Sequence, residues 1–301
     1  LQGIDWGAGI PPALIVDSLI SSGDPIPPSL YQKNLSNPGA DAHGRLNLVG
    51  IDGLSAPYPL LQDSADESFI ALRVEIARQS GWDLLGDLEN AFLPITEPAH
   101  PGLVDEWLFT GRGFALHTSA LQAGWMLTVR ESYGGMTFWR VWIRARYQDG
   151  SQGEPLRARP WNLGARSSGD PRAFEEGGKV EPIPPGYWID FTELAARFSW
   201  KPLPALSNWR TYYPAARFNQ FTFTEGLDWD AAMAQIYPPE AVHQATPIPS
   251  QIAPLFYPTA TSIYIMPDNG QSDGPTPPFR PPWTPLAEVK EVLCHTASLT
   301  S

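Results

Sequence analysis

The chain has 301 residues, of which 43% are hydrophobic and only 17% are charged, and its formal net charge is −12. This length is enough for one sizeable hydrophobic core with additional segments. Nucleic acid is excluded as a partner, because a phosphate backbone requires a cationic protein face. The sequence has no apolar run of about 18 residues and therefore predicts no membrane span.

The composition favours a location outside the cell. Tryptophan and proline are abundant, at 12 and 33 residues, whereas there is a single cysteine, which is typical of a bacterial secreted or cell-surface protein. Because the chain begins LQGIDWGAG without an initiator Met, we expect that a signal segment has been removed. The one cysteine, Cys294, cannot form an internal disulfide, and no role for it follows from the sequence.

Proline divides the chain into three parts. Residues 1–60 and 238–301 contain stretches such as DPIPPSLY and GPTPPFRPPWTP. Proline fixes φ and donates no backbone hydrogen bond, so these parts are predicted to be extended arms with polyproline II character. The periodic patterns lie between them, and residues 61–237 are predicted to form the folded core.

The first half of the core predicts helices followed by a hairpin. Ser64 and Glu67 have the spacing of a capping box before a helix over 64–80, which Gly81 ends. A second short helix is expected over 82–92. The further expectations are a β-hairpin of 124–132 and 137–147, with arginines on its solvent face and aromatics on both faces, and a third strand in 154–161.

The second half begins with a loop over 164–186. Asp190 and Glu193 then predict the start of a helix, 218–224 reads as a strand, and Asp228 starts a helix that Pro238 ends. Strands and helices do not alternate as in βαβ units. We therefore predict an α+β fold: a single core with a small antiparallel sheet and flanking helices, plus long proline-rich extended arms at both termini.

Catalytic and metal-binding patterns are lacking in the sequence. The five histidines lack zinc-site spacing, and there is no nucleophile elbow and no phosphate-binding loop. His117 is expected to end a strand and to hydrogen-bond to the backbone. We therefore predict no catalytic residues, no metal ligands and no cofactor.

Tryptophans are the strongest candidates for ligand contacts. Exposed indoles stack well on sugar rings, whereas core packing is the alternative, because tryptophan is usually mostly buried. The candidate stacking residues are Trp139, Trp142, Trp188 and Trp209.

The segment LFTGRGFAL, with a preceding helix and a later helix and strand, resembles zinc D-alanyl-D-alanine carboxypeptidases and their hedgehog-type relatives. Their motif is Ser-x-His-x-x-Gly-x-Ala-x-Asp, in which the His and Asp bind zinc. Aligned on Gly111, those ligand positions hold Leu108 and Ala115, and a later element that supplies a His holds only Phe218, Asn219 and Gln220. Leucine and alanine cannot ligate zinc, so the resemblance implies an inactive relative of this fold.

The arms contain apolar residues suited to docking on other proteins. These predicted assembly anchors are Leu30, Tyr31, Phe256, Tyr257, Tyr264, Phe279 and Trp283. We therefore expect a non-catalytic secreted or cell-surface protein that is a subunit of a filament, sheath or surface layer. Its expected partners are copies of itself, other surface proteins or cell-wall glycan. Two alternatives stay open: a cell-wall peptidase-like enzyme, and a carbohydrate- or peptidoglycan-binding module that uses exposed tryptophans.

Overall fold

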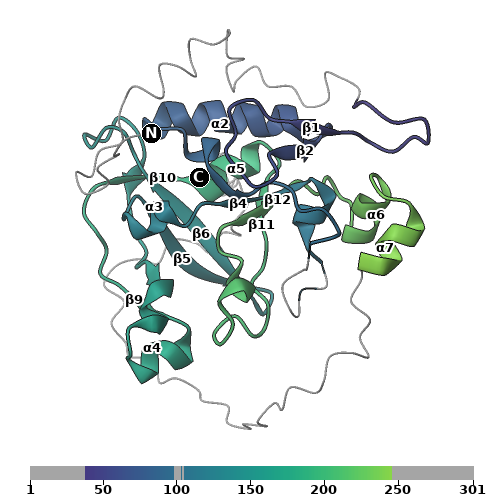
Figure 1. The fold of residues 1–301 in the computed structure, drawn as a ribbon. Helices are drawn as coiled ribbons and strands as arrows, with labels where there is room; N and C mark the ends of the chain where they lie inside the picture. The colour runs from purple at the N-terminus through teal and green to yellow at the C-terminus, as the bar shows by residue number, and fades with distance from the viewer. Residues whose placement is uncertain (1–37, 98–102, 104, 246–301) are drawn as a thin grey trace, which may run out of the picture.

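The computed structural model describes residues 38–97, 103 and 105–245, which form a mixture of helices and small sheets (Figure 1). Every pairing between its named strands is antiparallel. The predicted α+β class is thus confirmed. Within these described ranges, no helix combines the length and the apolar character that crossing a bilayer requires.

The first four-stranded sheet contains the predicted hairpin. Its strands β5 and β6 are joined by Gly134 and Gly135, whose φ values of 57° and 79° lie in the left-handed region that glycine adopts without strain. The strand order is β5-β6-β10-β7, with bounds Met126–Tyr133, Met136–Arg144, Tyr187–Asp190 and Glu154–Pro155.

The second four-stranded sheet brings together segments that are far apart in the sequence. Its order is β11-β12-β4-β3, with bounds Lys201–Pro202, Gln220–Thr222, Gly113–Leu116 and Leu88–Asn90. β4 is buried along its whole length, as its sequence GFAL requires. In the register, Gln220 faces Ala115 and Phe221 faces Phe114.

Two of the predicted helices cover this core. Helix α2 (Asp66–Ser80) runs along the top of the molecule in Figure 1 and ends at Gly81, whose φ of 83° makes a left-handed cap. Helix α5 (Phe191–Arg197) contacts both α2 and β6. It begins as predicted, because the Asp190 side chain accepts a hydrogen bond from the Glu193 backbone N–H at 3.0 Å.

Aromatic rings join the helices to the second sheet. Phe69 of α2 packs edge-on against Phe114 of β4, with ring centroids 5.5 Å apart. Phe114 also stacks on Phe221 of β12 at 5.4 Å and lies 4.9 Å from Trp200. All four rings are fully buried, so they anchor α2 to the sheet.

Short elements complete the described part. Strands β1 and β2 pair with each other, as do β8 and β9, with bounds Leu48–Gly50, Leu60–Gln62, Trp161–Asn162 and Lys179–Val180. The short α-helices are α3 (Ser119–Gln122), α4 (Pro171–Glu176), α6 (Trp229–Ala234) and α7 (Pro239–Ala245). The 3-10 turns are η3 (Leu84–Gly86), η4 (Trp107–Thr110), η5 (Leu163–Ser167) and η6 (Tyr213–Ala216).

The packed body extends beyond the predicted core boundaries of 61 and 237. β1 lies within the predicted N-terminal arm, and Ile51 and Leu54 belong to the main hydrophobic cluster. At the other end α7 follows α6, because Pro239 occupies the first turn of a helix, where its lack of an N–H is harmless. The folded part therefore begins before residue 48 and continues at least to residue 245.

Other local expectations were wrong where tertiary contacts override sequence pattern. Residues 82–92 form η3 and strand β3 rather than a helix, because β4 supplies a partner strand. The capping box is absent, since Ser64 bonds to the Gln62 side chain and α2 has no side-chain cap. Residues 164–186 contain η5, α4 and β9 rather than a plain loop.

The predicted faces of the hairpin also need correction. Arg140, expected on a solvent face, is buried, because β6 lies between β5 and β10 and a carboxylate pairs with it. Only Glu154 and Pro155 of the predicted third strand pair with this sheet, and β10 occupies the place beside β6. Proline at 155 and 160 explains the interruption, since it donates no ladder hydrogen bond.

Candidate binding site

A small cavity of about 120 Å³ lies where β3, β4 and η4 meet the segment 213–220. Leu108 and Ala115, both buried, form part of its wall. The lining also includes Phe218, Asn219 and Gln220, of which Gln220 pairs with Ala115 across β12 and β4. The structure thus brings together the residues that the aligned motif and its later element select from the sequence.

Glu106 is held firmly at this cavity. It caps η4, and its Oε1 accepts a hydrogen bond from the Leu108 backbone N–H at 3.3 Å. Its backbone carbonyl accepts a hydrogen bond from Trp229 Nε1 of α6 at 3.0 Å. Glu106 is only 2% exposed, so contacts within the protein fix the position of its carboxylate.

Arg217 adds a buried cation to the lining of the cavity. Its Nη2 donates to the Asp105 carbonyl at 2.6 Å and to the Asp105 carboxylate at 3.1 Å. Its backbone has φ 51°, in the left-handed region that a non-glycine residue seldom adopts. Strain of this kind persists only where surrounding contacts impose it, and it concentrates at functional sites.

Asn219 connects the cavity to the edge of the sheet. Its side-chain amide donates to Glu89 at 2.9 Å and to the Leu116 carbonyl at 2.7 Å. The cavity therefore combines carboxylate, guanidinium and amide groups with the apolar surface of Leu108 and Ala115. Such a surface can hold a small polar group by hydrogen bonds.

The two positions that would hold the zinc ligands of the aligned motif carry no metal donor. Leu108 and Ala115 offer no nitrogen, sulfur or oxygen donor from their side chains. Among the residues described, no group of three or more His, Cys, Asp or Glu side chains is arranged to hold a metal ion. His117 follows β4, and its Nδ1 accepts a hydrogen bond from the Ser119 backbone N–H at 3.1 Å, which confirms the predicted backbone contact.

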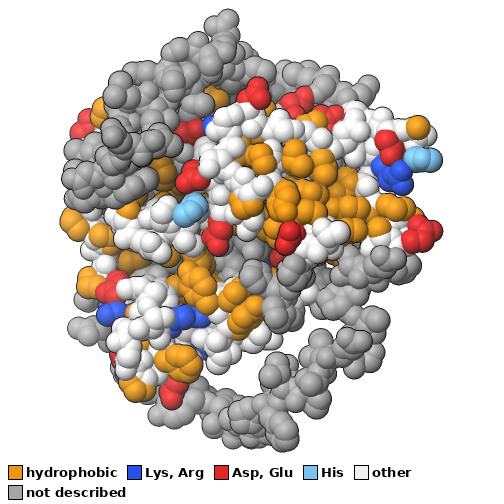
Figure 2. All heavy atoms as spheres, in the orientation of Figure 1, with side chains coloured by type: hydrophobic (Ala, Val, Ile, Leu, Met, Phe, Trp, Pro, Cys, Tyr) orange, Lys and Arg blue, Asp and Glu red, His pale blue; other side chains and the backbone are white. Residues whose placement is uncertain are grey.

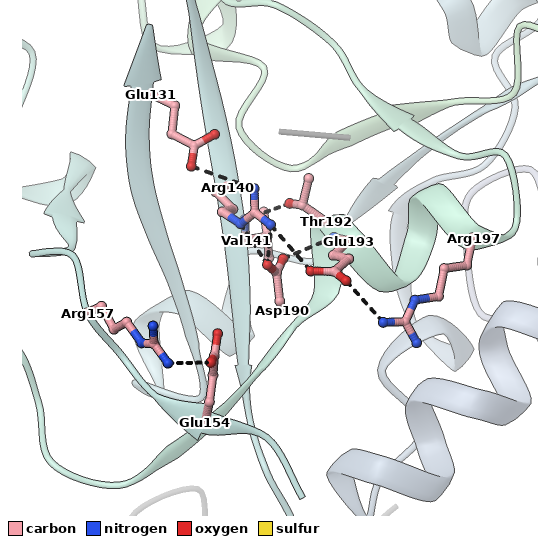
Figure 3. Close-up of polar contacts among 9 residues, drawn as sticks. All are labelled: Glu131, Arg140, Val141, Glu154, Arg157, Asp190, Thr192, Glu193 and Arg197. Carbon is pink, nitrogen blue, oxygen red and sulfur yellow. Dashed lines mark hydrogen bonds and ion pairs between the residues drawn. The ribbon is translucent and has the colours of Figure 1, made fainter. Parts of the chain in front are cut away.

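A second polar cluster surrounds Arg140 on β6 (Figure 3). Its guanidinium Nε lies 2.7 Å from the Asp190 carboxylate, and its terminal nitrogens lie 3.6 Å from Glu193 and 3.7 Å from Glu131. Glu193 also pairs with Arg197 at 3.0 Å. The Arg140 cluster therefore ties strands β5, β6 and β10 to helix α5.

A cavity of about 240 Å³, lined by Asp190, Glu193 and Glu154 among others, lies beside this cluster. Burial raises the pKa of Asp190, and the nearby Arg140 opposes that shift only in part. Each of these carboxylates already has an arginine within ion-pair distance. We therefore assign the Arg140 cluster a stabilising role in the fold.

The four candidate stacking tryptophans are not exposed, which corrects the expectation of an open indole surface. Trp139 packs edge-on against Trp209, with centroids 5.1 Å apart, in the main core. Trp142 and Trp188 belong to a smaller buried cluster. None of the four exceeds 8% exposure, so their rings are occupied by packing.

The predicted assembly anchors lie outside the described residues, as does Cys294. Arg217 was not identified from the sequence, because no local motif contains it. Glu106 holds the serine position of the aligned motif, but its place beside Arg217 in one cavity was not predicted, because 111 residues separate the two. The one local signal was an acidic residue directly before WLFT, which caps η4.

Comparison with family models, with curated proteins and with solved structures finds no match to this chain. Function must therefore be argued from the residues and their geometry.

Proposed function

We propose that this chain is a non-catalytic interaction protein of the bacterial cell surface or the extracellular space, and that it works as a subunit of an assembly. In this proposal the cavity at Leu108 and Ala115 accepts a polar group of a neighbouring copy or another surface protein. The proline-rich residues 1–37 and 246–301 provide further contacts between subunits.

The observation that supports this proposal best is the composition of the cavity. Leu108 and Ala115 stand where the carboxypeptidase-like motif would have its zinc ligands, and both line one cavity together with Gln220. Without ligands there is no activated water, whereas Glu106 and Asn219 still give the cavity a polar lining. A pocket of that kind favours binding over hydrolysis.

Metal analysis of the purified full chain tests the non-catalytic part. We expect no stoichiometric zinc after dialysis against zinc and then against buffer. Stoichiometric zinc would favour the alternative of a cell-wall enzyme, because it would show that side chains other than Leu108 and Ala115 form a metal site.

Multi-angle light scattering tests the assembly part. We expect the full chain to form species larger than a monomer and residues 38–245 alone to be monomeric. A full chain that is monomeric at all accessible concentrations would contradict the proposal.

A pocket-filling variant tests whether the cavity takes part. Ala115→Leu places a larger side chain in the cavity and should weaken association, whereas Ala123→Leu, at the half-exposed end of α3, should not. Equal association of both variants would remove the cavity from the proposal. Circular dichroism of each variant shows whether it is folded.

The carbohydrate-binding alternative loses its main support, because the tryptophans that would form its surface are buried. Sedimentation with insoluble peptidoglycan tests it directly, and we expect the chain to stay in the supernatant.

A further inference from the structure

Two arginines on this acidic protein lie against buried tryptophans without a carboxylate partner. Arg130 of β5 places its guanidinium carbon 4.3 Å from the Trp161 ring centroid and 5.9 Å from that of Trp209. Arg210 lies 4.7 Å from the same Trp209 ring. Both arginines are exposed, so their donor groups can reach a ligand.

Most arginines of the described region have an acidic partner, as Arg73 has with Asp83 and Arg217 with Asp105. Within that same region, Arg130 and Arg210 form no ion pair and no hydrogen bond with a carboxylate. Glu176 is the one acid that interacts electrostatically with Arg130, and its carboxylate is bonded to Arg172 at 3.0 Å.

The two cations also repel each other. The side chain of Arg130 reaches solvent, but its guanidinium is partly desolvated against the Trp161 ring, which lowers its pKa, and the positive charge of Arg210 lowers it further. Two like charges beside one indole, with no carboxylate in hydrogen-bond or ion-pair contact and only the weaker influence of Glu176, make a site that an anion would stabilise. On the face in Figure 2, blue Lys and Arg side chains gather at the lower left, where Figure 1 labels α4.

The loop that carries Arg210 packs tightly against the end of α4. Gly177, the C-cap of α4, packs so closely that an added Cβ would lie 2.7 Å from the Arg210 Cα. The Arg166 guanidinium donates to the carbonyls of Gly177 at 2.8 Å and Trp209 at 3.1 Å. The loop that carries Arg210 is therefore fixed before any ligand binds, which reduces the entropy that binding must overcome.

A further cavity borders this cluster. It has a volume of about 560 Å³ and shares Trp161 with the Arg130 contact. It also contains Tyr213, whose ring lies 5.1 Å from the Arg166 guanidinium. Leu121, Leu127 and several prolines make much of its wall apolar.

We propose that Arg130 and Arg210 bind an oxyanion, a carboxylate or phosphate group, of an organic ligand whose less polar part occupies this neighbouring cavity. Guanidinium groups form paired, charge-assisted hydrogen bonds with either oxyanion. The two cavities share Thr118 and Tyr213, but the one at Leu108 contains neither Arg130 nor Arg210, so this proposal does not depend on the function proposed above.

Isothermal titration calorimetry of the full chain tests the proposal with two probes, inorganic phosphate and glucuronate, at constant ionic strength set with chloride. We expect saturable binding of at least one probe. Phosphate alone would identify a phosphate-bearing ligand, and glucuronate alone a carboxylate-bearing one. Binding of neither probe would overturn the proposal.

Variants locate the binding. Arg130→Gln with Arg210→Gln keeps planar groups against the indoles but removes both charges, and it should weaken binding by about tenfold or more. Arg157→Gln, which removes an exposed arginine paired with Glu154, should change affinity less than about twofold. Unchanged affinity in the folded double variant, as judged by near-UV circular dichroism, would refute the assignment.

Discussion

Asp190 performs two tasks with one side chain, so its removal should destabilise the protein strongly. One carboxylate oxygen accepts the Glu193 backbone N–H at 3.0 Å and so caps α5, and the other accepts from Arg140 Nε at 2.7 Å. Loss of a helix N-cap costs about 1 kcal/mol. Removal of one partner from a buried ion pair costs roughly 3–5 kcal/mol.

The loss of stability in Asp190→Ala should be smaller than the sum of these two costs. Arg140 would keep Glu193 at 3.6 Å and Glu131 at 3.7 Å, so its charge would not be left alone. We expect a loss of about 3 kcal/mol in the free energy of unfolding. For a folded part of this size, that corresponds to a decrease of roughly 6–12 °C in Tm.

Urea denaturation followed by circular dichroism measures this loss, with the thermal transition as a second readout. Arg157→Ala is the control, since it breaks an exposed pair with Glu154 that Figure 3 shows beside the Arg140 cluster, and it should cost less than about 1 kcal/mol. Asp190→Asn keeps an acceptor for the cap and should fall between the two. An Asp190→Ala loss no larger than that of Arg157→Ala would refute the reasoning.

Three further predictions concern stability. Gly111→Ala places a Cβ 2.9 Å from a backbone nitrogen at a residue with φ 65°, so the free energy of unfolding in urea should fall by roughly 3 kcal/mol. Gly135→Ala, at φ 79° with open space around the added Cβ, should lower it by about 1 kcal/mol. Equal losses would exclude the close approach as a cause. Burial and the neighbouring Asp63 carboxylate raise the pKa of Asp66 above 3.8, so the native state binds a proton at Asp66 more tightly than the unfolded chain does. The stability that Asp66 contributes is therefore present at low pH and is lost as the pH rises through the folded pKa. Asp66→Asn should therefore add about 0.5 kcal/mol at pH 7 and progressively less as the pH falls toward 4, whereas a constant difference in urea midpoints would contradict the sign. Trp139→Ala, at a side chain that is 1% exposed, should cost roughly 3–5 kcal/mol, and a near-native denaturation midpoint would show that this indole is not part of the core.

Local signals in the sequence were sufficient where neighbours along the chain supply the contacts. The hairpin was predictable because Gly134 and Gly135 allow a tight turn between two apolar runs. The start of α5 was predictable because Asp190 caps a backbone N–H three residues away. Fold class followed from the order of such elements.

Sequence patterns failed to predict the structure where the decisive contact partner is distant along the chain. Residues 88–90 became a strand because β4, more than twenty residues later, pairs with them. Arg140 became buried because Asp190, fifty residues away, compensates its charge. Alternating polarity along β6 could not reveal that partner, and so it predicted a solvent face.

The sequence by itself determined the α+β class, the hairpin, the caps of α5 and α6, and the absence of donor side chains at Leu108 and Ala115. Only the tertiary structure decided that these two residues share a cavity with Gln220 and that Arg130 and Arg210 border one indole. The physical reason is that turns and caps depend on backbone bonds between near neighbours. Cavities and charge clusters depend on strand pairings and packing between segments about a hundred residues apart.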